Sequence, residues 1–597
     1  MPPTKIAQIG YRRFDYQGRG SRASGGTLAP AVGWLRGPWG GYQPGLDPSQ
    51  ADANAAKTCL NLIDREGILT HMNGWDKVNS AKLPLGDAAL PSATPEPVVG
   101  IFEGRKNSTQ AVRRYAVTSD TTAGGGHFFE LVSSVWTERT YTGAGTAFTG
   151  DSSDASATLV DAAHFAVGDY TVFVSGQGNA IYRFPNAGAT NNYEALASLG
   201  ALTSLRAQSC CVSDERIHVF GTTEGGTYFP ARWRWTSKGA NGAFDPSATG
   251  SGFADLNEFG GEAVAVRPIG PKIALYLNNG TMLARRTGIT TDPFARDYTF
   301  YGRGLLGTKS VVDLGDGTHF GLFTDGWFRF SYNGQWEQRG LTDKNYYKWR
   351  QEFYNTLNWA QRKRVVCEYD ENDHWVYIAF PTAGSGTNGP TEVWIYDLMR
   401  DTVWPMTTLG TQTPNVFGKW TEEVVAGATW GGSTGTWGGT SGSWGSLEGQ
   451  VGRKRIVHGT GTATDVGGMI YQHLPSLVTR DGSLPTYLYS LVPFSGDRPD
   501  LFKNLRGVYV NYTRVLGNGA DPTPISIVAT SDSGKTFSGQ IDHTKGPDRS
   551  QQEDFVSGSL SAQTHEVSVS GTAPVKIGGI AIAVVGSTGG VRKEGSV

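Results

Sequence analysis

The sequence has few cysteines and no long apolar run, and each shortage excludes a class of protein. Its four cysteines, Cys59, Cys210, Cys211 and Cys367, lack metal-ligand spacing, and the adjacent pair has poor geometry for a mutual disulfide. Their apolar and aromatic neighbours predict buried free thiols. No run of about 18 apolar residues occurs, and the N-terminus lacks the apolar core of a secretory signal. We therefore expect a protein made in the cytosol, without a membrane-spanning segment.

Charge is also scarce. Lys and Arg number 52 and Asp and Glu 54, which gives a formal net charge of −2. Charged residues make up 18% of the chain, against roughly 25% in an average soluble domain. Without a global positive field the chain does not attract nucleic acid or anionic membranes. This argument does not exclude a local basic patch. We expect any contact with DNA to lack sequence specificity.

Catalytic motifs are missing as well. The sequence contains no His-Glu-x-x-His, no clustered Cys and His, and no Gly-x-Ser-x-Gly. His374, at the edge of an apolar strand, is interpreted as structural, and Asp370 and Glu371 lie in a turn. Their adjacency says nothing about the carboxylate separation that glycoside hydrolysis requires. We expect no enzyme activity, no cofactor and no metal, while a glycosidase stays an alternative because glycosidases have no motif readable in one sequence.

One segment partly matches the motif of a nucleotide-binding loop. Residues 531–537, SDSGKTF, end like a phosphate-binding loop, but Ala529 stands where the first glycine is required. The residues that follow do not predict a helix that would present its N-terminus to phosphate. The segment resembles an Asp box, which implies a turn between strands in which Asp532 caps backbone N–H groups.

Glycine and aromatic residues are abundant. The chain has 82 glycines and 28 prolines, and Trp, Tyr and Phe together make up 11% of it. Frequent turn formers disfavour helical bundles, and aromatic residues favour packed sheets over disorder. A length of 597 residues predicts about two to four domains or one repetitive architecture.

Short strands separated by Gly, Asn, Asp and Ser turns dominate residues 95–470. Hairpin turns are predicted at Asp325-Gly326 and Asn279-Gly280. In residues 375–380, WVYIAF, apolar side chains point to both faces, which is typical of stacked sheets rather than a sheet open to water. The pattern predicts an all-β chain whose body is a β-propeller-like or sandwich-like stack of small antiparallel sheets.

The expected organisation has three parts. Residues 1–46 form an extended N-terminal arm, 47–474 the propeller-like body, and 475–597 a C-terminal all-β sandwich or barrel. The arm's candidate assembly contacts on a neighbouring subunit are Arg12, Arg13, Trp34 and Trp39. An arm packed on its own domain is the equally weighted alternative.

Two local patterns refine this organisation. The Ala-rich segment after Ser49 predicts a short capped helix that runs into a strand at residues 59–64. In the Gly- and Ser-rich segment 429–447, Trp430, Trp437 and Trp444 recur seven residues apart without helix-forming sequence between them. We interpret them as structural packing turns, with a ligand-binding aromatic ladder as the less favoured alternative.

An ordered set of segments resembles the tail-nozzle proteins of short-tailed bacteriophages. Residues 52–78, DANAAKTCLNLIDREGILTHMNGWDKV, are similar to the opening of such proteins and end in a turn of the R-x-G-W style, here MNGW. Further similar segments follow in the family's order over roughly residues 50–450, and the Trp-Gly turns also resemble those of the family. These segments are 169–184, 216–222, 232–286, 302–336, 370–381 and 392–404.

The resemblance implies a structural virion protein made in the host cytoplasm. It implies a propeller-like body, a homo-hexameric ring below the head-tail adaptor or portal, and contacts with tail fibres or a tail needle. It also implies that viral DNA is retained by the ring and passes through its lumen during ejection. The alternatives are a carbohydrate-binding or carbohydrate-processing propeller and another phage tail component such as a fibre-attachment protein.

Overall fold

The computed structural model describes residues 31–586 apart from loops. The longest loops outside the description are 84–95, 149–158, 422–452, 494–502, 515–523 and 542–550, and residues 1–30 and 587–597 also lie outside it. The chain divides into two compact units, one formed by residues 73–341 and 350–482, the other by residues 1–72, 342–349 and 483–597. Each unit is all-β apart from short helices.

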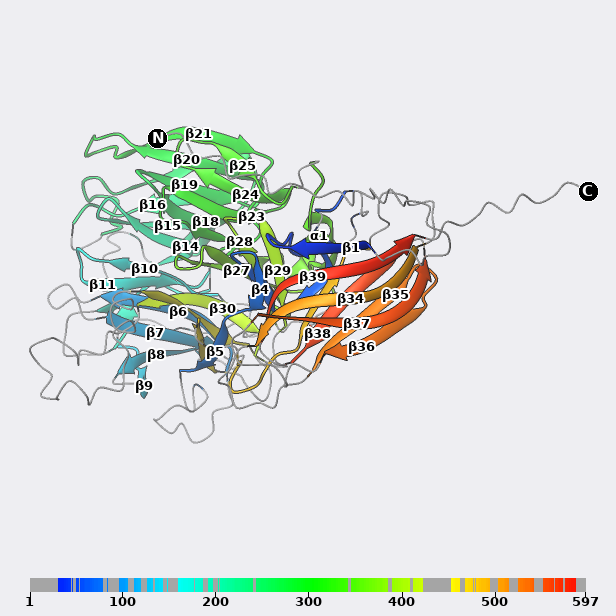
Figure 1. Cartoon of the computed structure of the whole chain (residues 1–597). Helices are drawn as coiled ribbons and strands as arrows, with labels where there is room; N and C mark the ends of the chain where they lie inside the picture. The colour runs from blue at the N-terminus through cyan, green and yellow to red at the C-terminus, as the bar shows by residue number, and fades with distance from the viewer. Residues whose placement is uncertain are drawn as a thin grey trace, which may run out of the picture. The chain divides into compact units, whose positions relative to one another are not determined.

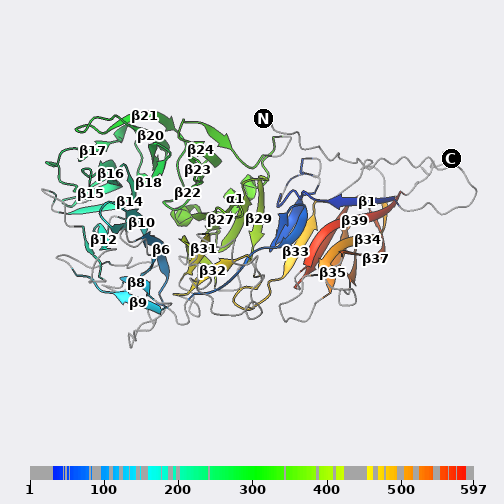
Figure 2. The ribbon, with the colours of Figure 1, turned by 60° about the vertical axis from the view of Figure 1, so that its left-hand side comes forward.

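The first unit is a β-propeller of seven four-stranded antiparallel sheets, here called blades 1 to 7 (Figures 1 and 2). In Figure 2 the blades follow one another around a ring in chain order. Blade 1 comprises β6 (Val98–Arg105), β7 (Val112–Ser119), β8 (Gly126–Val132) and β9 (Val135–Arg139); blade 2 comprises β10 (Asp161–Phe165), β11 (Tyr170–Val174), β12 (Tyr182–Pro185) and β13 (Glu194–Ala195). Blade 3 comprises β14 (Leu205–Ser213), β15 (Arg216–Glu224), β16 (Thr227–Trp235) and β17 (Gly252–Asp255); blade 4 comprises β18 (Ala263–Ile269), β19 (Lys272–Leu277), β20 (Gly280–Arg286) and β21 (Phe294–Tyr301).

The remaining blades follow the same plan. Blade 5 comprises β22 (Val311–Asp313), β23 (Thr318–Phe323), β24 (Gly326–Ser331) and β25 (Trp336–Gln338); blade 6 comprises β26 (Val366–Asp370), β27 (Trp375–Phe380), β28 (Glu392–Asp397) and β29 (Thr402–Met406). Blade 7 comprises β30 (Pro414–Thr421), β31 (Lys454–Thr460), β32 (Ile470–Leu474) and β5 (Gly74–Lys77). The unit's helical turns are η2 (Asn257–Phe259), α1 (Arg350–Thr356) and η3 (Trp359–Arg364).

The predicted hairpins and the two-sided burial are confirmed. Phe323 pairs with Gly326 across the Asp325-Gly326 turn, and Tyr276 pairs with Thr281 across Asn279-Gly280. Every residue of β27 is buried, because neighbouring blades pack on both of its faces. The hydrophobic clusters lie between successive blades, where the apolar faces of adjacent sheets meet.

The ring closes with a strand from outside the repeat. Strand β5 is the outermost strand of blade 7, although it precedes blade 1 in the chain, and it pairs with β32. Residues 477–481 hold its other edge: Gly74 N donates to Leu477 O (2.7 Å), and Trp75 N donates to Thr479 O (3.1 Å). The buried Trp75 donates from Nε1 to Gln412 Oε1 (2.9 Å). The MNGW turn is therefore the closing contact of the propeller.

The second unit is a sandwich of two antiparallel sheets. One sheet has the order β3-β4-β39-β34-β37 with β1 also paired to β39; the other has the order β2-β33-β38-β35-β36. Its first strands are β1 (Ala31–Arg36), β2 (Ala56–Leu60), β3 (Leu62–Arg65) and β4 (Ile68–His71). Its last strands are β33 (Tyr487–Leu491), β34 (Lys503–Arg514), β35 (Ile525–Ser531), β36 (Thr536–Ile541), β37 (Gln551–Ala562), β38 (His565–Gly571) and β39 (Val575–Gly586). In Figure 1 the blue strand β1 lies along the red strand β39.

The domain organisation differs from the sequence-based expectation at the N-terminal side. Residues 47–72, assigned to the propeller-like body, belong to the sandwich unit, and the propeller begins at Asn73 and ends at Gly482 instead of 474. Residues 31–36 of the expected arm form strand β1. Pairing across the chain's ends decides this arrangement, because the N-terminal strands complete sheets whose other strands lie about 500 residues later.

The predicted helix after Ser49 is wrong. Residues 50–55, where described, form turns, and the chain enters strand β2 at Ala56. Gly40 N donates to Asn54 O (3.1 Å), and Ala55 N donates to Asp52 O (3.0 Å). Ala55 and Ala56 are fully buried, so the alanines permit close packing instead of promoting a helix.

Candidate functional site

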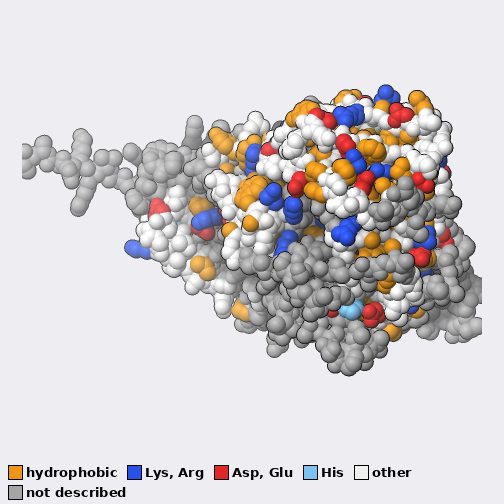
Figure 3. Space-filling model, turned by 180° about the vertical axis from the view of Figure 1, so that it is seen from behind, with side chains coloured by type: hydrophobic (Ala, Val, Ile, Leu, Met, Phe, Trp, Pro, Cys, Tyr) orange, Lys and Arg blue, Asp and Glu red, His pale blue; other side chains and the backbone are white. Residues whose placement is uncertain are grey.

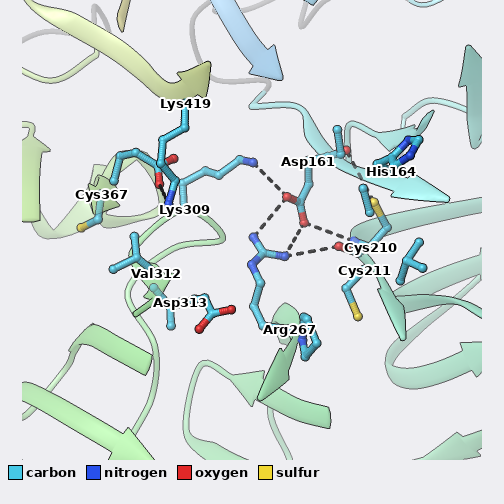
Figure 4. A pocket seen from close by; sticks show the side chains of 16 residues that line it. Asp161, His164, Cys210, Cys211, Arg267, Lys309, Val312, Asp313, Cys367 and Lys419 are labelled. Atoms are coloured by element: carbon cyan, nitrogen blue, oxygen red, sulfur yellow. Dashed lines mark hydrogen bonds and ion pairs between the residues drawn. The ribbon is translucent and has the colours of Figure 1, made fainter. Parts of the chain in front are cut away.

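A cavity of about 360 Å³ lies at the propeller axis (Figure 4). Its charged walls come from the first strands of blades 2, 4, 5, 6 and 7 and from Lys309 just before β22. First strands of neighbouring blades contact one another, as β10 does with β14 and β14 with β18. A side chain that points inward from one blade therefore meets side chains from several others.

Asp161, the first residue of β10, is the centre of the charged cluster. Its carboxylate accepts hydrogen bonds from Arg267 Nη1 (2.7 Å) and Nη2 (3.1 Å), and from Lys309 Nζ (2.9 Å). Ser209 Oγ (2.7 Å) and Cys210 N (3.2 Å) donate to the same carboxylate. Figure 4 shows the contacts of Arg267 and Lys309 with Asp161. The cluster therefore ties blades 2, 3 and 4 to the start of blade 5.

The neighbouring cations and hydrogen-bond donors keep the carboxyl group of Asp161 ionised. Burial by itself raises the pKa of the carboxyl, but the charges of Arg267 and Lys309 and the hydrogen bonds of Arg267 and Ser209 outweigh burial and hold the pKa well below its usual range. Burial likewise opposes the charge of Arg267, yet Asp161 raises the pKa of its guanidinium. The carboxylate is ionised at neutral pH and has no proton to give as a general acid.

A second ionic group forms another part of the cavity wall. Lys419 on β30 lies 3.3 Å from Glu368 and 3.4 Å from Glu371, and Lys454 lies 3.3 Å from Glu371. Burial lowers the pKa of Lys419, but the two glutamates more than offset it and raise that pKa. The group joins blade 6 to blade 7 with two positive and two negative charges.

The thiols along the cavity are inert. Cys210, Cys211 and Cys367 line it, and all four cysteines of the chain are buried and free, as the sequence predicts. Burial raises the pKa of each of these three thiols well above its usual value. A protonated thiol is a poor nucleophile. Among the described residues, no group of three or more His, Cys, Asp or Glu side chains could hold a metal ion.

The candidate assembly residues of the arm differ in where the structure places them. Arg12 and Arg13 lie outside the described residues, and Trp34 is in β1, where it pairs with Ala581. Trp39 is buried in its own sandwich unit: its backbone N–H donates to Asp64 (2.9 Å). Its indole donates to Gly67 O (3.1 Å) and packs edge-on to Tyr489. Trp39 as an assembly contact is therefore wrong, because burial makes it an internal anchor.

The remaining predicted residues have the following positions. Trp430, Trp437 and Trp444 lie outside the described residues, so their role as packing turns stays a prediction. His374 Nδ1 and the hydroxyl of Tyr369 share a hydrogen bond of 2.8 Å. Glu371 lies in the turn formed by residues 371–374, as predicted, whereas Asp370 is the last residue of strand β26.

The Asp-box-like segment is a hairpin turn between β35 and β36. Ser531 Oγ accepts the N–H of Lys535 (2.9 Å), and the N–H of Gly534 donates to Ser531 O (2.9 Å). Asp532 also reaches beyond this turn, where its carboxylate accepts the N–H of Thr564 (3.4 Å). The absence of a following helix agrees with the rejection of a nucleotide-binding loop.

Sequence reasoning missed the Asp161 cluster. Asp161 lies 106 residues before Arg267 and 148 residues before Lys309 in the chain. They meet because Asp161 and Arg267 lie in the first strands of blades 2 and 4, and Lys309 lies just before the first strand of blade 5. The available signal was a charged residue inside an apolar strand pattern, as in VAVRPIG around Arg267. Such a signal becomes specific only once the blades are aligned.

Within the described part of the chain, the helices are too short or too polar to cross a lipid bilayer.

No protein-family model matches the chain, and no curated protein matches it. The chain is similar to solved β-propeller structures at low identity. A neuraminidase-like protein of A/flat-faced bat/Peru is 12% identical over 69% of this chain and 95% of its own, with a TM-score of 0.28. AztD from Citrobacter koseri is 9% identical over 59% and 81%, with a TM-score of 0.29. A fructofuranosidase from Schwanniomyces occidentalis is 8% identical over 86% and 99%, with a TM-score of 0.24. At these scores the likenesses carry no argument about the function of this chain.

Proposed function

We propose that this chain is a structural subunit of the tail nozzle of a short-tailed bacteriophage, in which six copies form a ring below the head-tail adaptor. The nozzle assignment depends on the ordered segments that resemble this family. The resemblance implies a propeller-like body, and the chain contains a seven-bladed propeller. The MNGW turn that opens the resemblance is the contact that closes the ring of blades.

The observation that carries a structural role is the state of Asp161. The axis of a propeller is where convergent polar side chains offer a site for chemistry. Here the buried carboxylate accepts five hydrogen bonds and joins blades instead of meeting a substrate. We infer that the purified chain has no hydrolase activity on glycans, peptidoglycan, nucleotides or esters, and saturable turnover of any of these would contradict that inference.

The surface charge suits a nozzle that lets DNA pass. Each phosphate neutralised by Lys or Arg strengthens DNA binding and would slow passage. Figure 3 shows basic, acidic and apolar side chains interspersed over one face of the molecule instead of a segregated basic field. The formal net charge of −2 agrees with weak binding to DNA. In this proposal the ring retains DNA, conducts it without sequence-specific contacts, and also contacts tail fibres or a tail needle.

Mass photometry with a portal-adaptor complex tests the ring. A closed ring of identical subunits uses one head-to-tail interface repeated by rotation. Six copies of a 64.0 kDa chain, about 384 kDa, should add to the adaptor. A chain that forms a stable dimer and never adds to the adaptor would refute the hexamer. Imaging a virion in which this chain is labelled would then separate a nozzle from a fibre-attachment protein.

A carbohydrate-binding propeller is the second candidate, and exposed aromatic side chains on outer strands favour it. Tyr298 and Tyr301 on β21 are 43% and 64% exposed, and Phe253 on β17 is 50% exposed. Lys272 Nζ lies 4.8 Å from the ring centroid of Tyr298. Exposed aromatic faces next to polar groups suit the stacking of sugar rings.

A glycan array separates the two candidates. The binding module predicts reproducible glycan binding that is lost in Tyr298→Ala and Tyr301→Ala, and retained in Met399→Ala, whose side chain is 74% exposed on the turn after β28. The structural subunit predicts no glycan signal in any of these proteins. Release of reducing sugar by the wild-type chain would instead indicate carbohydrate processing.

A further inference from the structure

We propose that the axial cavity binds a small oxyanion, a carboxylate or phosphate group, at the ammonium of Lys309. The inference is independent of the virion assignment, because it depends only on the side chains at the cavity. It rests on a surplus of positive charge in the Asp161 cluster, on unused donors at Lys309, and on the space in front of them.

The Asp161 cluster contains two cations and one anion. Arg267 and Lys309 both bind the carboxylate of Asp161, and one positive charge is left uncompensated within the cluster. The two Nη atoms of Arg267 are already occupied: besides Asp161, they donate to protein oxygens at 2.8–3.3 Å. These oxygens are Ser209 Oγ and the carbonyls of Cys210, Val266 and Thr308.

Lys309 is the cation with donors to spare. An ammonium has three N–H groups, and among the described residues its hydrogen-bond acceptor is Asp161. The side chain is 23% exposed, whereas that of Asp161 is 3% exposed. The anion is thus enclosed in protein, while the cation faces the cavity, as Figure 4 shows for the extended Lys309 side chain.

The other titratable groups of the cavity lining are paired, neutral or exposed to solvent. Lys419 and Lys454 balance Glu368 and Glu371 one for one. Burial lowers the pKa of His164, so the imidazole is neutral at pH 7. The lining holds one further anion, Asp313, which is exposed and whose Oδ1 accepts the N–H of Gly315 (2.9 Å).

The cavity has room for a molecule larger than a bare ion. Its volume of about 360 Å³ compares with roughly 30 Å³ of liquid volume for one water. Val212, Val311 and Val312 supply apolar surface to the same cavity. A ligand with an oxyanion and a short apolar or sugar-sized body would bind the Lys309 ammonium through the oxyanion and cover the valine side chains with its body. Water alone would hydrogen-bond the ammonium and leave the apolar surface uncovered.

Calorimetric titration tests the site with phosphate and with acetate as separate probes, at an ionic strength held constant with chloride. We expect saturable binding of at least one probe to the wild-type chain. Lys309→Met should weaken that binding at least tenfold, and Lys309→Arg should retain it because the charge remains. Lys238→Met is the matched control, since Lys238 is 52% exposed and pairs with Asp214 and Glu215, and these three residues are not part of the cavity lining.

Equal binding by Lys309→Met and the wild type would overturn the proposal, as would heats no larger than those of chloride. A measurement on the wild-type chain keeps the test valid if Lys309→Met fails to fold. Acetic anhydride footprinting read by mass spectrometry should show that the bound probe protects Lys309 and leaves Lys238 reactive. Unchanged acetylation of Lys309 at saturating phosphate and acetate would also overturn it.

Discussion

At the residue scale, Asp161 shows how a buried charge can brace a propeller. Its two oxygens receive donors from blades 3 and 4 and from the residue before blade 5. Taking such a carboxylate out of water is costly, and the cost is recovered only where every lone pair has a partner. The same contacts that stabilise the ring therefore keep the carboxylate out of acid-base chemistry.

Replacing this carboxylate tests its bracing role. Asp161→Asn removes the charge that compensates Arg267 and Lys309, and removing one partner of a buried ion pair costs roughly 3–5 kcal/mol of unfolding free energy. Urea unfolding followed by tryptophan fluorescence measures the loss. Asp245→Asn is the control, because among the residues that the structure describes this carboxylate is hydrogen-bonded to Ser247 in an exposed turn. Equal stability of both variants would show that the cluster contributes little.

Buried histidines predict a loss of stability in acid. Burial lowers the pKa of His218 to about 3, of His319 to about 4 and of His458 to about 3, while an unfolded histidine titrates near about 6.5. Below about pH 6.5 the unfolded chain binds protons that the folded chain excludes. The stability is complete above that pH and should fall progressively as pH decreases toward about 4.

His218→Gln tests one term of this dependence. His218 Nδ1 accepts the indole N–H of Trp233 (3.3 Å), and Nε2 faces Ser213 O (3.2 Å), so the neutral ring matches its partners. The variant should lower stability at pH 7 and flatten its slope between pH 6 and 4 by up to about 1.4 kcal/mol per pH unit. Urea midpoints at several pH values measure the slope, and a slope equal to the wild type's would contradict the assignment.

At the element scale, β5 is the strand on which the propeller depends for closure. It is held between β32 and residues 477–481, and Lys77 Nζ adds an ion pair to Asp481 (2.8 Å). Trp75 packs under the guanidinium of Arg480, at 4.6 Å from the ring centroid. A short strand with so many partners can join the two ends of a seven-bladed ring.

Gly74→Ala should open this closure. A Cβ at Gly74 would overlap the carbonyl oxygen of Thr479, so the two strands must separate, at a cost of about 1–3 kcal/mol. Thermal unfolding of the full chain should show a lower first transition. Gly178→Ala is the control, because a Cβ there meets open space. Identical transitions for the two variants would mean that the closing contact is dispensable.

At the scale of the whole molecule, the propeller is an insertion in the sandwich. The chain completes four sandwich strands, enters the propeller at Asn73, and returns to the sandwich after Gly482, with residues 342–349 also belonging to the sandwich unit. The two ends of the insertion meet, since Gly74 bonds Leu477 within the propeller. Both units therefore require the N-terminal residues 31–77, and the stability of the fold is expected to be sensitive to deletions there.

Two truncations separate folding from assembly. Deleting residues 1–30 preserves β1 and Trp39 and should leave the melting temperature unchanged while weakening addition to the adaptor. Deleting residues 1–46 also removes the buried Trp39, whose loss costs about 3–5 kcal/mol, and should unfold the sandwich earlier. Melting curves and mass photometry measure the two effects. If the chain that lacks residues 1–30 assembles as well as full length, Arg12 and Arg13 are not assembly contacts.

The sequence by itself determined the class of the fold and the repeating unit. Alternating apolar residues and Gly or Asn turns act within ten residues, so hairpins such as the one at Asp325-Gly326 were predictable. The burial of β27 on both faces followed from its continuous apolar pattern. The same local reasoning misassigned residues 50–55, because alanine favours a helix only where tertiary packing does not require its small size.

Only the tertiary structure decided which distant residues meet. The pairing of β1 with β39 and of β5 with β32 joins segments hundreds of residues apart, and no local pattern encodes those partners. Asp161, Arg267 and Lys309 became one cluster because seven blades direct their first strands to a common axis. A charge's role depends on what surrounds it in space, whereas the sequence orders residues only along the chain.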